Sequence, residues 1–287
     1  MTPDSERLLE VARDLIADCP AELGEEVVVT GSVGAGLADE HSDIELLFLG
    51  ETVPEPAGVR EWLDGVSGTE SVLVAREDSS VSGWFRLSGV EIDPFWGLLS
   101  QAVAEVDAIT TGTVLGHRRL AFAHVLLHSV HLRTRGALAE LAHRCAVYPA
   151  GLGPRLIEDA VRGWKIPAER IGPAVRGDVL EARAWLQDDA ERILRIVFAL
   201  NRRWEPPRWK WLRGYAEALP ISPPALVDRI DEALLLGELP EASRALAELG
   251  LEALELVPAE VECERARDGL RIRIAALDRQ AAVGARS

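Results

Sequence analysis

The sequence predicts an α+β protein in which a mixed sheet with helices precedes an all-helical region. Strand patterns concentrate in the first hundred residues, with an apolar run at residues 27–30 and an alternating run at residues 44–49. After Trp96 helical periodicity takes over. Apolar residues make up 48% of the chain but aromatic residues only 5%, which favours helices over a large sandwich. We expect two domains, residues 1–112 and residues 113–287, with the helical domain closing a cleft.

The first domain contains a series of short elements. Thr2-Pro3 predicts the start of a helix that ends at Pro20. Strands are expected at residues 27–30 and 44–49, and an amphipathic helix at residues 59–66. Residues 71–75 are strand-like, and residues 84–93 read as a hairpin that turns at Ser88-Gly89.

Two acidic residues, Asp43 and Glu45, begin the second predicted strand after a glycine-rich connection. The two-residue period of a strand places both side chains on one face. Neighbouring carboxylates repel each other, and a divalent cation relieves that repulsion; Mg²⁺, which prefers oxygen ligands, is the expected ion. Unobstructed backbone amides at Gly31-Ser32 would form an anion-binding nest beside it. The pattern predicts a site where phosphate and metal meet.

A surface turn followed by two solvated acids is the simpler alternative for this motif. It leaves unexplained why the face that carries both acids continues into Leu47 and Leu49, which we expect to be buried. We therefore favour the phosphate and metal site.

Gly31-Ser32, a ten-residue spacer and Asp43-x-Glu45 together resemble the signature of the nucleotidyltransferase superfamily related to DNA polymerase beta. The resemblance implies a nucleotidyltransferase fold for residues 1–112. It also implies a nucleoside triphosphate on Gly31-Ser32 and Mg²⁺ held by Asp43 and Glu45.

The superfamily carries a third carboxylate on a neighbouring strand, usually between two apolar residues. Ile92-Asp93 resembles that pattern, and Asp93 would then share the metal and accept a proton from the acceptor hydroxyl. Pro94 departs from the usual apolar residue, and Glu91 on the same predicted face is a competing candidate. Both acids would simply face water if this strand lay at an edge.

A tryptophan-rich segment, residues 201–212, carries the second candidate site. Its arrangement of Asn, aromatic residues, proline and Lys-Trp-Leu resembles the C-terminal helical domain of small-molecule nucleotidyltransferases, including those that adenylylate aminoglycosides. We expect Arg203 and Lys210 to contact the nucleotide, with Lys210 in a helix that Pro206-Pro207 begins. Lysine occurs only at positions 165 and 210. The alternative is a packed corner with cation–π contacts.

The rest of the helical half suggests no chemistry. Residues 165–177 are expected to form an irregular connection, a candidate lid. Asp178-x-x-Glu181 resembles a capping box that opens a helix ending near Asn201, and further helices follow residue 222.

Other combinations of metal-ligating residues are less convincing. The cysteines at 19, 145 and 263 are odd in number and far apart, which predicts buried thiols in a reducing cytoplasm. His124 and His128 have a spacing that fits a metal, but no Cys, Asp or Glu in that segment joins them, so we favour packed histidines.

A net charge of −16 argues against long DNA or RNA as a partner, because nucleic-acid binding depends on Lys and Arg. No apolar run is long enough to cross a membrane. We therefore expect a cytoplasmic Mg²⁺-dependent enzyme that moves a nucleoside monophosphate to a hydroxyl of a small, cationic or neutral molecule. The alternatives are a catalytically silent nucleotide-binding protein, an antitoxin-like protein of the same fold, and a structural helical interaction protein.

Overall fold

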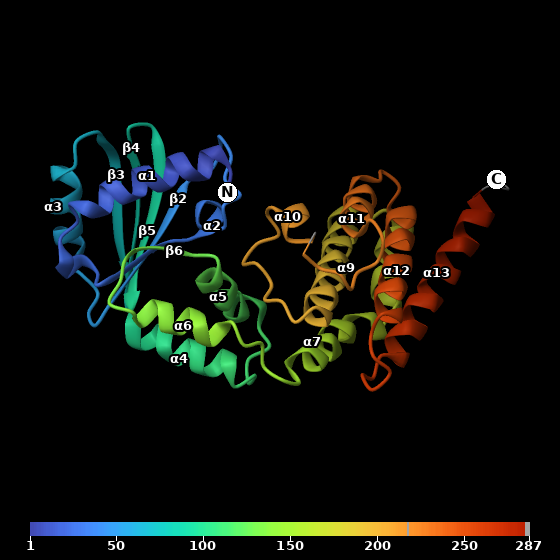
Figure 1. Cartoon of the computed structure of the whole chain (residues 1–287). Helices are drawn as coiled ribbons and strands as arrows, with labels where there is room; N and C mark the ends of the chain where they lie inside the picture. Colours follow the sequence, from blue (N-terminus) through green and yellow to red (C-terminus); the bar gives the residue numbers. More distant parts are fainter. Residues whose placement is uncertain (217, 285–287) are drawn as a thin grey trace. The chain divides into compact units, whose positions relative to one another are not determined.

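The computed structural model describes residues 1–216 and 218–284, and it confirms the α+β class (Figure 1). The chain forms two compact units. The first combines Met1–Tyr148 with a returning segment, Pro206–Trp211. The second takes Pro149–Glu205 and the chain from Leu212 onward. The first unit thus extends past residue 112 and includes a segment from late in the chain.

A six-stranded mixed sheet forms the centre of the first unit, in the order β3-β4-β5-β2-β1-β6. Neighbouring strands are antiparallel except β2 and β5, which run parallel. The strands are β1 (Glu26–Val29), β2 (Ile44–Gly50), β3 (Thr69–Glu77), β4 (Ser80–Leu87), β5 (Val90–Leu98) and β6 (Val130–Arg133). All the strands expected from the alternating pattern are present, including the hairpin β4-β5.

Strand β6 corrects the expectation that the chain is wholly helical after Trp96. Its four residues are too few for a period to be recognised, and their extended state is set by antiparallel pairing with β1, where Val28 lies opposite His131. The guanidinium of Arg133 also donates to the carbonyl groups of Ile16 and Gly24, at 3.0 and 3.1 Å. Tertiary contacts therefore create this strand.

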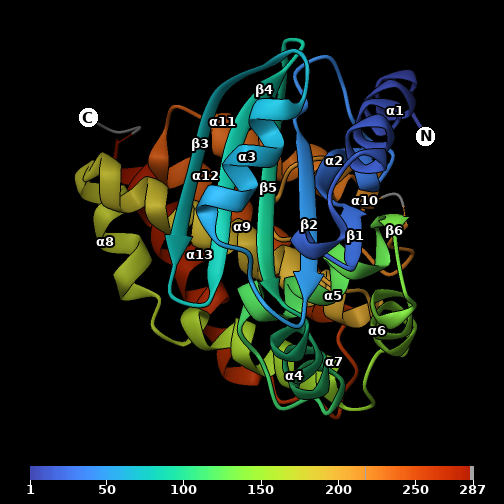
Figure 2. The same ribbon diagram turned by 90° about the vertical axis from the view of Figure 1, so that its left-hand side faces the viewer.

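Helices α1 (Pro3–Ala17) and α3 (Pro56–Gly65) cover one face of the sheet (Figure 2). The hydroxyl of Thr2 accepts a hydrogen bond from the amide of Ser5, as the predicted cap requires. The core on this face is formed by alternate strand residues, which are Ile44, Leu46, Phe48, Phe85, Ile92 and Trp96. The intervening residues of β2 and β5, among them Glu45, Leu47, Asp93 and Phe95, belong to the opposite face, here called the second face.

Four more helices complete the first unit: α2 (Gly31–Gly34), α4 (Leu99–Thr110), α5 (His117–Leu127) and α6 (Ala137–Cys145). The buried carboxylate of Glu26 caps α6, because it accepts hydrogen bonds from the hydroxyl of Thr134 and from the amides of Arg135 and Ala137 at 2.7, 2.8 and 2.9 Å. Burial pushes the pKa of Glu26 upward, but these hydrogen bonds outweigh it and the pKa is lowered. Strand β1 and α6 are thereby joined.

All the regular elements in the described residues of the second unit are helices. Its elements are α7 (Leu152–Ala160), a 3₁₀ turn η2 (Val161–Lys165), α8 (Ala168–Arg176), α9 (Val179–Leu200), α10 (Leu212–Ala216), α11 (Leu226–Leu235), α12 (Leu239–Glu255) and α13 (Glu264–Gly284). The expectation of an irregular connection at residues 165–177 is wrong, because α8 forms there. Helix α9 has the predicted bounds, but Asp178 accepts from Arg176 instead of capping it.

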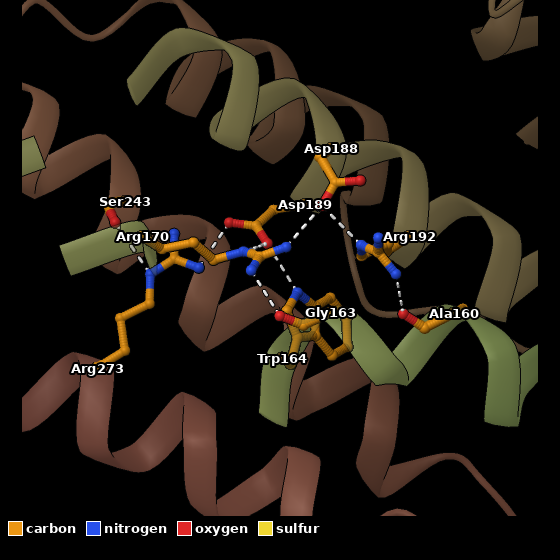
Figure 3. Close-up of polar contacts among 9 residues, drawn as sticks. All are labelled: Ala160, Gly163, Trp164, Arg170, Asp188, Asp189, Arg192, Ser243 and Arg273. Atoms are coloured by element: carbon orange, nitrogen blue, oxygen red, sulfur yellow. Dashed lines mark hydrogen bonds and ion pairs between the residues drawn. The ribbon is translucent and has the colours of Figure 1, made fainter. Parts of the chain in front are cut away.

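A buried polar cluster stabilises the second unit (Figure 3). The two carboxylate oxygens of Asp189, on α9, accept from the indole of Trp164 at 2.7 Å and from the guanidinium groups of Arg170 and Arg273 at 2.8 and 2.5 Å. The side chains of Arg170, Asp189 and Arg273 are each only 1% exposed. Arg170 comes from α8, and its burial explains why that segment is ordered as a helix.

The cysteines are free and buried as expected, and burial raises the pKa of Cys19 and of Cys145 to about 11. None of the helices in the described part of the chain combines the length and the apolar character that crossing a bilayer demands.

Candidate functional site

The predicted acids converge on the second face of the sheet, where β2 and β5 run side by side. Glu45 lies opposite Asp93 in the parallel register, and Asp43 directly precedes β2. All three side chains are half-buried. Parallel neighbouring strands lie about 4.8 Å apart, so the backbones that carry Glu45 and Asp93 are held at that spacing. An acid on β2 and an acid 48 positions later in the chain are thus neighbours.

The turn after β1 approaches the carboxylate of Glu45 closely. Gly31 has a φ of +61°, and a Cβ at this position would lie 2.7 Å from the carboxyl carbon of Glu45. The amide of Thr30 donates to the carbonyl of Glu45 at 2.9 Å, which joins the end of β1 to β2. Ser32 follows Gly31 in the single turn of α2. The predicted phosphate turn and the predicted acid are therefore in contact.

Burial is the main reason why Glu45 and Asp93 resist ionisation. Burial, and then the charge of Asp43, raises the pKa of Glu45. The pKa of Asp93 is also raised, first by burial and then by the charges of Asp43 and Glu91. Lys210 acts in the opposite direction on both Glu45 and Asp93. Negative charge is concentrated here beyond what one lysine offsets.

Lys210 lies close enough to lower the pKa of Glu45 and of Asp93, because Pro206–Trp211 belongs to the first unit. The indole of Trp209 stacks on the imidazole of His117, with ring centroids 5.4 Å apart and ring planes 24° from parallel. The expected helix over this segment is wrong, because its residues form bends and turns and α10 begins only at Leu212. The positive φ of Trp211, 58°, is incompatible with a continuous right-handed helix.

The other predicted residues differ in their surroundings. Glu91 is exposed and forms an ion pair with Arg86 across the hairpin, at 3.4 Å. Geometry therefore favours Asp93 over Glu91 as the third carboxylate. Arg203 is an exposed residue of the second unit. His124 and His128 stack on each other with centroids 4.1 Å apart, as packed histidines do.

The fit of a metal ion depends on the donor set. In residues 1–216 and 218–284, no group of three or more His, Cys, Asp or Glu side chains stands ready to hold an ion. The carboxylate of Glu45 instead lies against the Gly31 backbone, with the hydroxyl of Thr30 at 3.5 Å. Asp43, Glu45 and Asp93 nevertheless supply hard oxygen donors in an environment of mutual repulsion, which suits Mg²⁺. Reorientation of the Glu45 side chain would bring this donor set together.

The first unit also has two pockets that sequence reasoning did not find. One, of about 480 Å³, is polar; its lining includes Asp43, Glu91, Arg7 and Arg86. The other, of about 510 Å³, is mostly apolar, and its strand lining begins at Leu47 and Phe95, two residues past Glu45 and Asp93 on the second face. In the sequence, this apolar pocket is indicated only by the strand alternation, which places Phe95 on the same face of the sheet as Asp93. Leu49 is buried as expected, at 3% exposure, whereas Leu47 is half-buried, and both line this pocket.

Comparison with known proteins adds little to this geometry. No family model matches the chain, and no curated protein matches it. Among solved structures, a nucleotidyltransferase-like protein from Exiguobacterium sibiricum aligns with 96% of this chain and 78% of its own, at 9% identity and a TM-score of 0.36. A similarity this weak does not establish a shared fold, so any function has to be argued from the site itself.

Proposed function

We propose that this protein transfers a nucleoside monophosphate from a nucleoside triphosphate to a hydroxyl group of a small molecule, with release of pyrophosphate. One observation carries the proposal: Asp43, Glu45 and Asp93 gather beside the Gly31 turn, within the electrostatic reach of Lys210. Phosphoryl chemistry uses such a combination of carboxylates, cation and close backbone approach.

The carboxylates would hold Mg²⁺, with Asp43 and Glu45 as the main ligands and Asp93 sharing the ion. When bound, the ion neutralises phosphate charge and favours departure of pyrophosphate. The raised pKa values of Glu45 and Asp93 support this assignment, because a site that concentrates negative charge favours cations.

The chain's own residues would perform the remaining tasks. The Gly31-Ser32 turn would receive the triphosphate, and the ammonium group of Lys210 would balance its negative charge. Asp93 would accept the proton of the acceptor hydroxyl, whose oxygen forms a new bond to the α-phosphorus. The bond from that phosphorus to the bridging oxygen breaks, and pyrophosphate leaves with the electron pair.

The acceptor is expected to be small and either cationic or neutral. The net charge of −16 disfavours a polyanionic acceptor. Neither transfer RNA nor duplex DNA should bind at physiological salt, and tight binding of either in a filter assay would contradict this part of the proposal.

Asp43→Asn tests the function. With Mg²⁺ and a triphosphate at 100 times its dissociation constant, wild-type stability should rise by about 2.7 kcal/mol. The variant should lose this stabilisation and the release of labelled pyrophosphate, while its circular dichroism spectrum is unchanged. Glu51→Gln, an exposed acid just past β2, is the matched control and should behave as wild type.

Two outcomes would decide against the enzyme. Unchanged pyrophosphate release in Asp43→Asn would exclude the acid site. Mg²⁺-dependent binding of triphosphate by wild type, with no turnover on any hydroxylated compound, would favour a catalytically silent nucleotide-binding protein.

A further inference from the structure

The apolar pocket on the second face lies next to the carboxylates, and its lining has a consistent chemistry. Strand residues Leu47, Leu49 and Phe95 form one side of it, and Ala104 and Phe122 contribute from α4 and α5. Its volume of about 510 Å³ falls within the range of about 300–1,000 Å³ that small-molecule sites occupy.

Phe95 is the unusual residue of this pocket. It is 44% exposed although β5 has hydrogen-bonded neighbours on both sides. Phe95 forms a contiguous apolar surface with the other apolar residues of the pocket, and such surfaces mark ligand-binding grooves. Gly97 leaves open space beside the ring of Phe95. A Cβ at this position would fill that space, 3.1 Å from Phe95 Cε1 and 3.3 Å from Leu49 Cδ2. A ligand is therefore able to reach the aromatic ring.

The charged side chains that line the pocket are paired with each other and leave no charge for a ligand. The carboxylate of Glu105, one of its lining groups, accepts two hydrogen bonds from the guanidinium of Arg119, each 2.7 Å long. This bidentate pair satisfies both charges. A polycationic molecule would therefore find no free anion among the lining groups, whereas a neutral apolar group would displace water from the leucine and phenylalanine side chains.

The strand order indicates which substrate would occupy the pocket. The Gly31 turn follows β1, and β2 separates β1 from β5. Asp93, the proposed proton acceptor, is on β5, two residues before Phe95, which corresponds to about 7 Å along the strand. The pocket is lined by residues of β2, β5, α4 and α5 and by none of β1 or the Gly31 turn, which favours the acceptor over the phosphates as its occupant.

We infer that the acceptor carries a neutral apolar moiety, aliphatic or aromatic, which the pocket holds while the adjoining hydroxyl group lies at Asp93. This inference rests on the proposed function and narrows its substrate class. It places fully polar, polycationic acceptors of the aminoglycoside kind outside the class that the site fits.

The test uses the full chain and the neutral fluorescent probe N-phenyl-1-naphthylamine, whose emission rises in apolar surroundings. Octyl glucoside, below its micellar concentration, and methyl glucoside then compete with the bound probe. They share a hydroxylated head and differ only in the alkyl chain. Octyl glucoside should compete at least about 60-fold better, the effect of burying three methylene groups at about fourfold each.

Ala104→Trp should abolish probe binding, because the exposed Ala104 of α4 lines the pocket and an indole would fill it. Val103→Trp is the matched control on the same helix: Val103 is 36% exposed and is not among the pocket residues, so probe binding should persist. Phe122→Glu, from α5, introduces a charge into the lining and should also weaken binding at least tenfold. Melting temperatures show whether each variant is folded.

Three results would overturn the inference. The first is the absence of probe binding by wild type, or equal binding by Ala104→Trp and Val103→Trp. The second is equal competition by the two glucosides. The third is displacement of the probe by triphosphate with Mg²⁺, which would assign the pocket to the nucleobase. Because none of these readouts requires turnover, loss of the proposed enzyme activity and loss of this pocket are distinguished.

Discussion

Asp189→Asn removes the carboxylate that lies between two buried guanidinium groups of the second unit. In the native chain its oxygens accept from Trp164, Arg170 and Arg273 at distances of 2.5 to 2.8 Å. An asparagine of the same shape keeps one acceptor oxygen but turns an amino group toward a guanidinium. Arg170 retains Asp188 as a partner at 2.6 Å, whereas within the described residues Arg273 retains only the hydroxyl of Ser243.

The expected cost follows from the charge left behind. Arg273 is 1% exposed on its side chain, and its Nη2 lacks a hydrogen-bond partner within the described residues even in the native chain. Breaking a buried ion pair by removing one partner costs about 3–5 kcal/mol. A domain of this size is stable by only about 5–15 kcal/mol, so its melting temperature should fall by about 10–20 °C.

Differential scanning calorimetry of the full chain measures this effect. Asp188→Asn is the control: its side chain is 32% exposed, and the substitution should cost about 1–1.5 kcal/mol. Adding Arg273→Met to Asp189→Asn should recover part of the loss, because the unpaired charge leaves with it. A melting temperature within about 2 °C of wild type for Asp189→Asn, or equal losses for the two asparagine variants, would refute the reasoning.

Three further predictions concern the first unit. Lys210→Met should raise the KM for triphosphate about tenfold, the effect of losing about 1.4 kcal/mol of charge-assisted binding. Lys165→Met, which alters the chain's other lysine, should leave the KM unchanged, and equal kinetics for both variants would contradict a phosphate role for Lys210. Gly31→Ala should cost about 1 kcal/mol of stability, because alanine disfavours the left-handed conformation of this residue. It should also abolish stabilisation by Mg²⁺-triphosphate, because the new Cβ would displace the Glu45 carboxylate. Retained stabilisation in a thermal shift assay would contradict this contact. Glu26→Gln should cost about 2 kcal/mol of stability at pH 7. Because the native pKa of Glu26 is lowered, the stabilisation by its carboxylate is present above the unfolded value of about 4.3 and is lost as the pH falls through the native pKa. Urea denaturation at pH 7 and at pH 3 should therefore show the free energies of unfolding of the two proteins converging at the lower pH.

Local patterns were enough to predict most of the first unit. The period-two runs correspond to β2, β4 and β5, because one face of each strand is buried against α1 and α3. The continuous apolar run corresponds to β1, whose four residues are all buried. The bounds of α1 followed from Thr2 and Pro20, since capping and proline act within one turn of the chain. These features depend on neighbours in the sequence.

Errors occurred where distant contacts compete with local preference. Leu47 was expected to be buried but is half-buried, because alternation alone does not say which face of a strand the helices cover. Ile44, Leu46 and Phe48 pack under the helices, and Leu49 is buried on the other face. The proline pair at 206–207 suggested a helix start. That segment instead extends to stack Trp209 on His117.

The sequence by itself determined that Asp43 and Glu45 share a strand face after a glycine turn, because this follows from the two-residue period of a single segment. Only the tertiary structure decided that Asp93 lies opposite Glu45, that Lys210 returns to the same acids, and that an apolar pocket adjoins them. Strand pairing and the return of the chain depend on the free energy of packing segments that are 48 to 165 positions apart, and no local periodicity records such contacts.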